Sequence, residues 1–427
     1  MNRTIQPEIQ SLKNFSILEP IRTPLPNGIP LTIINAGEQD VTRMDILFGG
    51  GRWQQSQKLQ ALFTNRMLRE GTKNYTAATI AEKLDYYGSW LELSSSSDFA
   101  YITVYSLNKY LAKTLEVVES IIKEPLFPEK ELNTILDTNI QQYLVNTSKV
   151  DFLAHRSLLK ALYGDQHPCG KIVVEGDYHN ITPEVLRDFY ERYYHSGNCS
   201  VFLSGKVTDD IIRRVTDTFG APFGKHQLKT PKLSFPFTTV PEKRIFVERE
   251  DTMQSAVKMG YTTITREHTD YLKLRVLMTV FGGYFGSRLM SNIREEKGYT
   301  YGISAGIMFY PDSGLLAIAT ETDNEYVEPL IKEVYHEIDR LHQEPVSVEE
   351  LTMVRNYMLG EMCRSYESPF SLSDAWIFIA TSGLNDDYFS RSLQAVNEVT
   401  PAEIQDLAQR YLCKETLKEV IAGKKLS

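Results

Sequence analysis

The chain has 427 residues, which at roughly 150 residues per domain suggests two or three domains. Its 46 basic and 55 acidic residues argue against a nucleic-acid partner, because nucleic-acid-binding domains usually carry a strongly basic surface. Apolar residues make up 42% of the chain and charged residues 24%, close to the averages of folded globular proteins. This composition excludes collagen-like repeats, disulfide-rich scaffolds and wholesale disorder.

Targeting segments are not apparent in the sequence. No run of about 18 apolar residues occurs, so we expect no membrane-spanning helix and no membrane partner. Residues 1–10 lack the apolar stretch of 7–15 residues that a secretory signal needs. We therefore expect a cytoplasmic protein, whose four cysteines form no C-x-x-C pair and read as free thiols.

The first half shows strands followed by helices. Residues 46–48 end a strand at a glycine run, residues 99–105 are β-branched and aromatic as in a strand, and residues 110–122 have helical apolar spacing. Thr182 and Pro183 then predict a capped helix start, which leads into a strand at residues 201–203.

The second half repeats this order. Residues 314–320 predict a strand, residues 326–341 a helix, and residues 420–422 a last strand. Residues 399–424 match residues 181–206 without a gap at seven of 26 positions, including the Thr-Pro helix start. A proline-rich stretch over residues 222–241 separates the halves, since proline ends helices and central strands.

These patterns predict an α+β fold of two homologous α/β sandwich domains, each an antiparallel-rich sheet with helices on one face. We expect an N-terminal domain over residues 1–225, a linker over residues 226–240 and a C-terminal domain over residues 241–427.

Residues 280–303, VFGGYFGSRLMSNIREEKGYTYGI, are the most informative segment. They closely resemble the C-terminal-half motif of pitrilysin/insulinase-type zinc peptidases, a family that includes mitochondrial processing peptidases. The resemblance implies that the chain forms half of a peptidase clamshell. It also implies that Arg294 and Tyr301 contact an extended peptide substrate, the arginine through its donor fork and the tyrosine by stabilising an oxyanion.

The same resemblance implies an inverted zinc motif, H-x-x-E-H, in the first half. Aligned on Gly71-Thr72, its positions hold Leu62, Asn65 and Arg66, and the expected third ligand falls near Gln142. Leucine and arginine offer zinc no lone pair. We therefore expect no metal or other cofactor in this chain, and zinc in a partner subunit.

Other catalytic patterns are weaker. No two histidines stand four residues apart, and Glu333, His336 and Glu337 read as a solvated helix face paired with Arg340. The Gly282-Gly283 turn lacks the spacing of a phosphate loop, and the serine run at residues 94–97 lacks a nucleophile elbow.

Three functions follow from the resemblance. The first is a non-catalytic subunit of a dimeric metalloendopeptidase, inactive alone, which pairs as a heterodimer with a homologous zinc-bearing subunit. The second is a structural core-protein-like subunit that cuts nothing. The third is an active homodimeric zinc peptidase with atypical ligands.

Overall fold

The structure, a computed structural model, describes residue 4, residues 17–225 and residues 229–425. Residues 1–10, on which the expectation of no secretory signal rests, lie outside the described residues except for Thr4, as do residues 226–228 of the predicted linker. Within the described ranges, no helix combines the length and the apolar composition needed to cross a bilayer.

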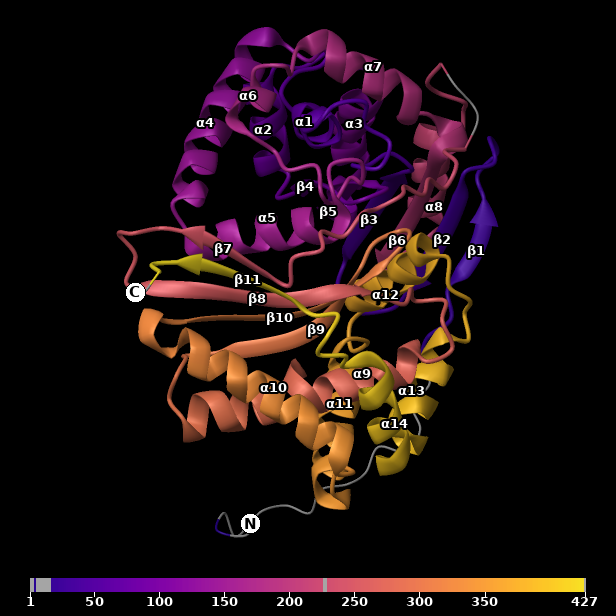
Figure 1. Cartoon of the computed structure of the whole chain (residues 1–427). Helices are drawn as coiled ribbons and strands as arrows, with labels where there is room; N and C mark the ends of the chain where they lie inside the picture. The colour runs from indigo at the N-terminus through magenta and orange to yellow at the C-terminus, as the bar shows by residue number, and fades with distance from the viewer. Residues whose placement is uncertain (1–3, 5–16, 226–228, 426–427) are drawn as a thin grey trace.

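The first half is built on a six-stranded sheet in the order β1-β2-β6-β3-β5-β4 (Figure 1). Only β2 and β6 pair in parallel. The strands are β1 (Ile21–Pro24), β2 (Pro30–Asn35), β3 (Val41–Phe48), β4 (Trp90–Ser95), β5 (Ala100–Leu107) and β6 (Cys199–Gly205). The helices of this half are α1 (Gln60–Met67), α2 (Ala77–Tyr86), α3 (Leu111–Lys123), α4 (Glu129–Thr147), α5 (Val150–Tyr163), α6 (Glu175–Tyr178), α7 (Pro183–Tyr193) and α8 (Asp209–Phe219).

The second half repeats this plan on a five-stranded sheet in the order β7-β11-β8-β10-β9, in which only β7 and β11 are parallel. The strands are β7 (Arg244–Glu248), β8 (Gln254–Thr263), β9 (Ile303–Phe309), β10 (Gly314–Asp323) and β11 (Lys418–Gly423). The helices are α9 (Tyr271–Met278), α10 (Val327–Gln343), α11 (Val348–Arg364), α12 (Pro369–Ser382), α13 (Tyr388–Glu398) and α14 (Pro401–Tyr411), with π-helical turns η3 (Thr279–Gly283) and η4 (Met290–Glu296) between α9 and β9.

The predicted repeat and fold class are confirmed. The equivalent helices α7 and α14 both begin with a threonine cap, Thr182 or Thr400, whose side chain accepts a hydrogen bond from a first-turn N–H, and both have proline in the first turn. The strands predicted at residues 99–105 and 314–320 are β5 and β10, and the helices predicted at residues 110–122 and 326–341 are α3 and α10. The two halves are therefore α/β sandwiches of one design.

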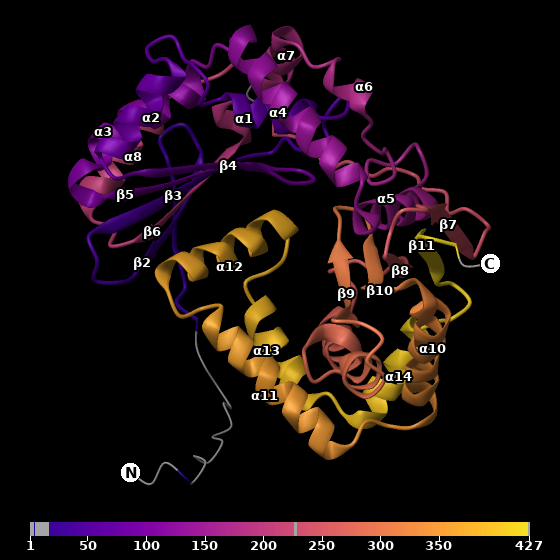
Figure 2. The ribbon, with the colours of Figure 1, turned by 90° about the vertical axis from the view of Figure 1, so that its left-hand side faces the viewer.

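The two halves exchange one helix each, which the sequence did not indicate. Helix α5 of the first half packs on β8 and β11 of the second sheet (Figure 1). Its side chains share a core with Ala256, Leu315 and Val420. Helix α12 of the second half lies under β2 and β6 of the first sheet (Figure 2). Each sheet thus has its own helices on one face and a helix of the other half on the opposite face.

The proline-rich stretch runs along this junction. Val240 donates its backbone N–H to the carbonyl of Ala161 on α5 (2.8 Å), and the Thr230 hydroxyl donates to the carbonyl of Gly49 at the end of β3 (2.5 Å). Phe235 of the same stretch donates its backbone N–H to Asp312 of the second half (3.1 Å), so the described part of the stretch contacts both halves.

Candidate functional site

Helix α1 carries the three positions at which the inverted zinc motif is expected. It is only eight residues long and begins after Leu59, which adopts a left-handed conformation with φ 71°. The Leu62 side chain is half-buried against the first core. Asn65 is 1% exposed, and its Nδ2 donates to the carbonyls of Ser94 (2.7 Å) and Tyr101 (3.3 Å). In the place of a catalytic glutamate, the chain therefore has an amide that fixes α1 to the edge strand β4.

Arg66 connects α1 to α4, the helix that would supply the third ligand. Its Nη1 donates to Oδ1 of Asn139 at 2.6 Å, and the arginine is exposed. Gln142 lies one turn further along α4, is exposed, and bonds within the helix to Asn146 (3.2 Å). The structure thus joins α1 to α4 through Arg66 and Asn139, and shows no hydrogen bond of Gln142 to α1 among the described residues.

This set of residues does not fit zinc. Leu62 has no donor atom, Arg66 is cationic with every nitrogen protonated, and only the amide groups of Asn139 and Gln142 remain. Among the described residues, no group of three or more His, Cys, Asp or Glu side chains is arranged to hold a metal ion.

The second candidate segment places Arg294 and Tyr301 in direct contact. Nε of Arg294, on η4, donates to the backbone carbonyl of Tyr301 at 3.0 Å. The guanidinium carbon lies 4.5 Å from the centre of the Phe285 ring, a cation–π arrangement. The Tyr301 residue is 92% exposed. Arg294 therefore holds the backbone of Tyr301 while the phenol projects into solvent, two residues before the edge strand β9.

Charged and polar anchors make this segment rigid. Arg288 forms a two-bond ion pair with Glu350 on α11, both bonds being 2.9 Å long. Nδ2 of Asn292, on η4, donates to Glu333 (3.0 Å) and Glu337 (2.7 Å) of α10. Because a two-bond arginine–carboxylate pair fixes orientation as well as distance, the platform under Arg294 is fixed from two helices.

Two positions of the motif require glycine, one for lack of space and one for its backbone conformation. A Cβ on Gly282 would lie 2.6 Å from the Cβ of Ala305, so only glycine lets η3 approach β9 this closely. Gly298 has φ +68°, a left-handed conformation that favours glycine, and it turns the chain between η4 and Tyr299.

The interpretation of the α10 carboxylates as a solvated face is wrong for one of them. Glu337 is fully buried, and it binds both Asn292 and Arg340 (2.9 Å). A buried carboxylate needs such partners, and here one of them comes from 45 residues away in the sequence. Glu337 therefore holds η4, the turn that carries Arg294, to α10 through Asn292.

Family models match most of the chain. Residues 35–172 match the model described as insulinase (peptidase family M16), and residues 180–358 match the model described as peptidase M16 inactive domain. The chain belongs to the insulinase family. Arg294 and Tyr301 lie within residues 180–358, the segment that matches the model described as peptidase M16 inactive domain.

Insulinase-family relatives are similar over most of their length. A Bacillus subtilis protein named uncharacterized zinc protease YmxG is 24% identical over 347 residues, 80% of this chain and 83% of the relative. A Helicobacter pylori protein named non-peptidase homolog YmxG is 24% identical over 372 residues, 85% of this chain and 84% of the relative.

Solved structures share the fold. A crystal structure titled peptidase M16 inactive domain, from Pseudomonas fluorescens, superimposes with a TM-score of 0.87 at 22% identity and covers 96% of this chain and 99% of its own. A structure of a protease from Helicobacter pylori gives 0.86 at 16% identity, covering 96% and 100%.

Sequence reasoning missed two contributors to the sites of this insulinase-family chain. Asn139 was overlooked because the expected ligand position is Gln142, although the two residues share a helix face at a spacing of three. Asn292 sits inside the quoted motif, but no local pattern shows that it binds α10.

Proposed function

We propose that this chain is the metal-free half of a two-chain zinc endopeptidase, and that Arg294 and Tyr301 contact the peptide beside a partner subunit's zinc. The proposal goes beyond the names of the relatives, which include a zinc protease and a non-peptidase homolog. Its partner is a homologous chain with an intact H-x-x-E-H motif.

One observation carries the proposal: a large phenol is exposed on a platform that is otherwise tightly bound. Exposing an aromatic side chain this fully contributes nothing to folding. Arg294 nevertheless holds the Tyr301 backbone, and Arg288 and Asn292 hold the same segment to α11 and α10 through charged partners. Such a design suits a group that has to meet a partner or substrate in a fixed position.

The chemistry available here is donation of hydrogen bonds. The Tyr301 hydroxyl can donate to a peptide carbonyl oxygen as negative charge develops on it, and Nη2 of Arg294 has no hydrogen-bond partner among the described residues. An arginine stays protonated at any working pH, so it supplies charge without taking part in proton transfer.

The test is complementation. The full chain, a zinc-bearing family member and an equimolar mixture are each incubated with a quenched fluorescent peptide of about 20 residues, and zinc is measured by mass spectrometry. We expect no cleavage and no stoichiometric zinc for this chain alone, and much faster cleavage by the mixture than by the homologue alone. Stoichiometric zinc with unaided turnover would instead support an atypical homodimeric peptidase.

The scaffold alternative is favoured by one finding, the description of the Helicobacter pylori relative as a non-peptidase homolog. As a scaffold, the chain would form a stable assembly in native mass spectrometry that contains no peptidase. Adding it to any zinc-bearing homologue would leave cleavage unchanged.

A further inference from the structure

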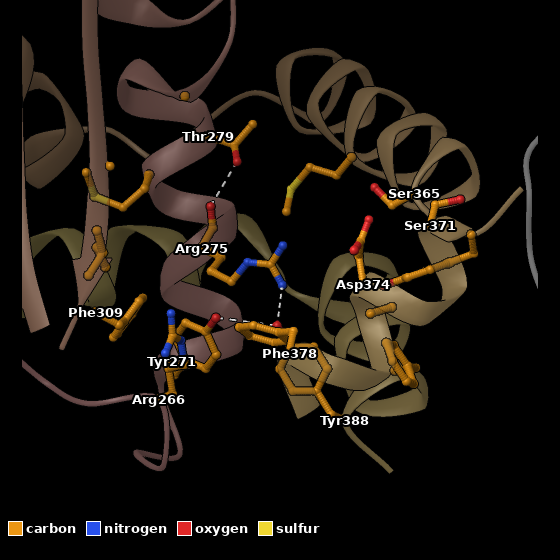
Figure 3. Close-up of a pocket in the computed structure, with 18 of the residues that line it drawn as sticks. Arg266, Tyr271, Arg275, Thr279, Phe309, Ser365, Ser371, Asp374, Phe378 and Tyr388 are labelled. Carbon is orange, nitrogen blue, oxygen red and sulfur yellow. Dashed lines mark hydrogen bonds between the residues drawn. The ribbon is translucent and has the colours of Figure 1, made fainter. Parts of the chain in front are cut away.

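A cavity of about 720 Å³ opens beside the edge strand β9 of the second half. Residues of α9 and β9 form one wall, and residues of α12 and α13 form the other (Figure 3). Neither the predicted zinc positions nor Arg294 and Tyr301 line it. The volume is in the range of small-molecule and peptide side-chain sites.

By the internal repeat, this cavity corresponds to the place where α1 and α4 meet in the first half. The order β8, α9, β9 repeats the order β3, α1, β4, and α11, which contributes Met358 to the lining, is the equivalent of α4. In the first half Arg66 and Asn139 form a hydrogen bond at this place. In the second half the corresponding place lines the cavity.

Two arginines give the cavity a positive charge. Nη1 of Arg275 donates to the hydroxyls of Tyr388 (3.0 Å) and Ser392 (3.2 Å), which are neutral groups. Arg266 is stacked between the rings of Phe309 (4.7 Å) and Phe378 (5.0 Å), and its Nη1 donates to Ser382 (3.3 Å). Neither arginine forms an ion pair within the described ranges.

The opposite wall carries one carboxylate, which is already paired. Asp374 of α12 reaches toward the cavity across from Arg275 (Figure 3) and binds Nη2 of Arg43 at 2.6 Å. Its charge is therefore partly compensated, while Nε and Nη2 of Arg275 have no hydrogen-bond partner among the described residues. A two-donor fork of this kind matches a carboxylate.

The remaining surface suits an extended peptide. Strand β9 pairs with β10 on one side, and no other described strand pairs with its outer edge. Ala305, Gly306 and Ile307 of this strand line the cavity, and the aromatic rings of Tyr271, Phe309 and Phe378 line the rest. Unpaired edge strands bind peptides through backbone hydrogen bonds, with side chains entering adjacent pockets.

We infer that this cavity binds a carboxylate of a peptide, with Arg275 as its partner and the aromatic rings around the adjacent residues. The inference takes from the proposed function only that the ligand is a peptide. Two sources supply this chemistry, an acidic side chain and a C-terminal carboxylate, and the experiment separates them.

The experiment measures binding to the full chain alone by fluorescence anisotropy. Three N-terminally labelled ten-residue peptides share one aromatic-rich neutral sequence: the first is amidated, the second has a free C-terminal carboxylate, and the third is amidated with one central glutamate. We expect one or both carboxylate peptides to bind about tenfold more tightly than the neutral peptide, because a charged hydrogen-bonded pair is gained. Equal binding of all three, or no binding, would overturn the inference.

Variants locate the site. Arg275→Gln should reduce carboxylate binding to the level of the neutral peptide, whereas Arg187→Gln, a matched control whose arginine bonds only the Leu126 carbonyl (3.0 Å), should not change it. A preference that survives in a folded Arg275→Gln chain would contradict the assignment. If the Arg275→Gln chain does not fold, Asp374→Asn provides the test. Removing the negative charge opposite Arg275 should tighten binding of the carboxylate peptides several-fold and leave binding of the neutral peptide unchanged. Absence of this gain would refute the site.

This outcome is independent of the proposed function. The assay contains neither zinc nor a partner subunit, so a failure to complement a zinc-bearing homologue leaves the binding result unaffected. Conversely, loss of carboxylate preference would leave the roles of Arg294 and Tyr301 to be tested on their own.

Discussion

Nη2 of Arg43 on β3 lies 2.6 Å from Oδ1 of Asp374 on α12, so an ion pair joins the sheet of one half to the exchanged helix of the other. The same guanidinium binds Asp45 on β3 through Nε (2.9 Å), and Thr103 donates to this carboxylate as well (2.7 Å). Burial raises the pKa of Asp45, although the charge of Arg43 opposes the shift. The two aspartates are thus held by one arginine but differ in exposure.

This difference predicts unequal costs of substitution. Arg43→Met leaves the buried Asp45 without a cation, and we expect the free energy of unfolding to fall by about 3–5 kcal/mol. Asp374→Asn keeps the Arg43–Asp45 pair and removes only an exposed partner, so we expect a loss of about 1 kcal/mol or less. Urea unfolding of both variants measures the two values, and an equal or larger loss for Asp374→Asn would refute the ranking.

A second contact between the halves should depend on pH. His167, fully buried after α5, lies 3.2 Å from both carboxylate oxygens of Asp312 in the β9–β10 turn, and its Nδ1 accepts the backbone N–H of Cys169 (3.1 Å). Since Nδ1 is an acceptor, Nε2 carries the proton and donates to Asp312. Burial raises the pKa of Asp312, but the bonds from His167 and from the backbone N–H of Phe235 outweigh it, and the net shift is downward.

A lowered folded pKa means that Asp312 stabilises the fold above its unfolded pKa of about 4 and that this contribution is lost as the pH falls through the folded value. We expect Asp312→Asn to lower the free energy of unfolding by about 1–3 kcal/mol at pH 7. The difference between wild type and variant should shrink below about pH 4. Melting temperatures from pH 3 to pH 7 test this, and a gap that stays constant over this range would contradict it.

The degenerate zinc site should be repairable. Because Arg66 of α1 bonds Asn139 of α4, we expect the triple substitution Leu62→His, Arg66→His and Gln142→Glu to bring three ligands within reach of one zinc ion, while Asn65 keeps its bond to β4. We expect about one zinc per chain at pH 7.5, measured by mass spectrometry after dialysis. The control variant keeps Arg66 and carries only Leu62→His and Gln142→Glu. Equal zinc content in both variants, or no zinc in the triple variant, would show that α1 and α4 no longer hold these positions in a zinc-binding arrangement.

Local patterns predicted much of this fold. The caps at Thr182 and Thr400 act within one turn, and the β-branched run of β5 alternates buried and half-buried side chains, so both could be recognised from a few neighbouring residues. The Arg294 segment was identified in a different way, by the resemblance of the residues between Gly282 and Tyr301 to the family's motif.

Long-range partners could not be predicted. An apolar helix pattern shows which face is buried but not on what, so the exchange of α5 and α12 between the sheets has no local signal. The burial of Glu337 depends on Asn292, and the closure of the zinc position depends on Arg66 meeting Asn139, 73 residues away. The open cavity at Arg275 likewise depends on packing between α9 and α12, which lie far apart in the chain.

Arg294 could act through its positive charge or by holding the backbone carbonyl of Tyr301, and a substitution can separate these two roles. Arg294→Lys keeps the positive charge but loses the planar fork that holds the Tyr301 carbonyl at 3.0 Å, so we expect a loss of activity nearly as large as for Arg294→Ala. If the mixture of Arg294→Lys with a zinc-bearing homologue kept most of the peptide-cleaving activity, only the positive charge of Arg294 would matter.

The central claim is tested most directly by kcat/KM of the mixture with a zinc-bearing homologue, measured with wild type, Arg294→Ala and Tyr301→Phe chains. Tyr86→Phe, a change at another highly exposed tyrosine (81% exposed), serves as the matched control. We predict a loss of about 100-fold for Tyr301→Phe, in line with removal of one oxyanion donor, a comparable loss for Arg294→Ala, and no change for Tyr86→Phe. Unchanged kcat/KM in both site variants would contradict the claim that this chain supplies these two groups to the reaction.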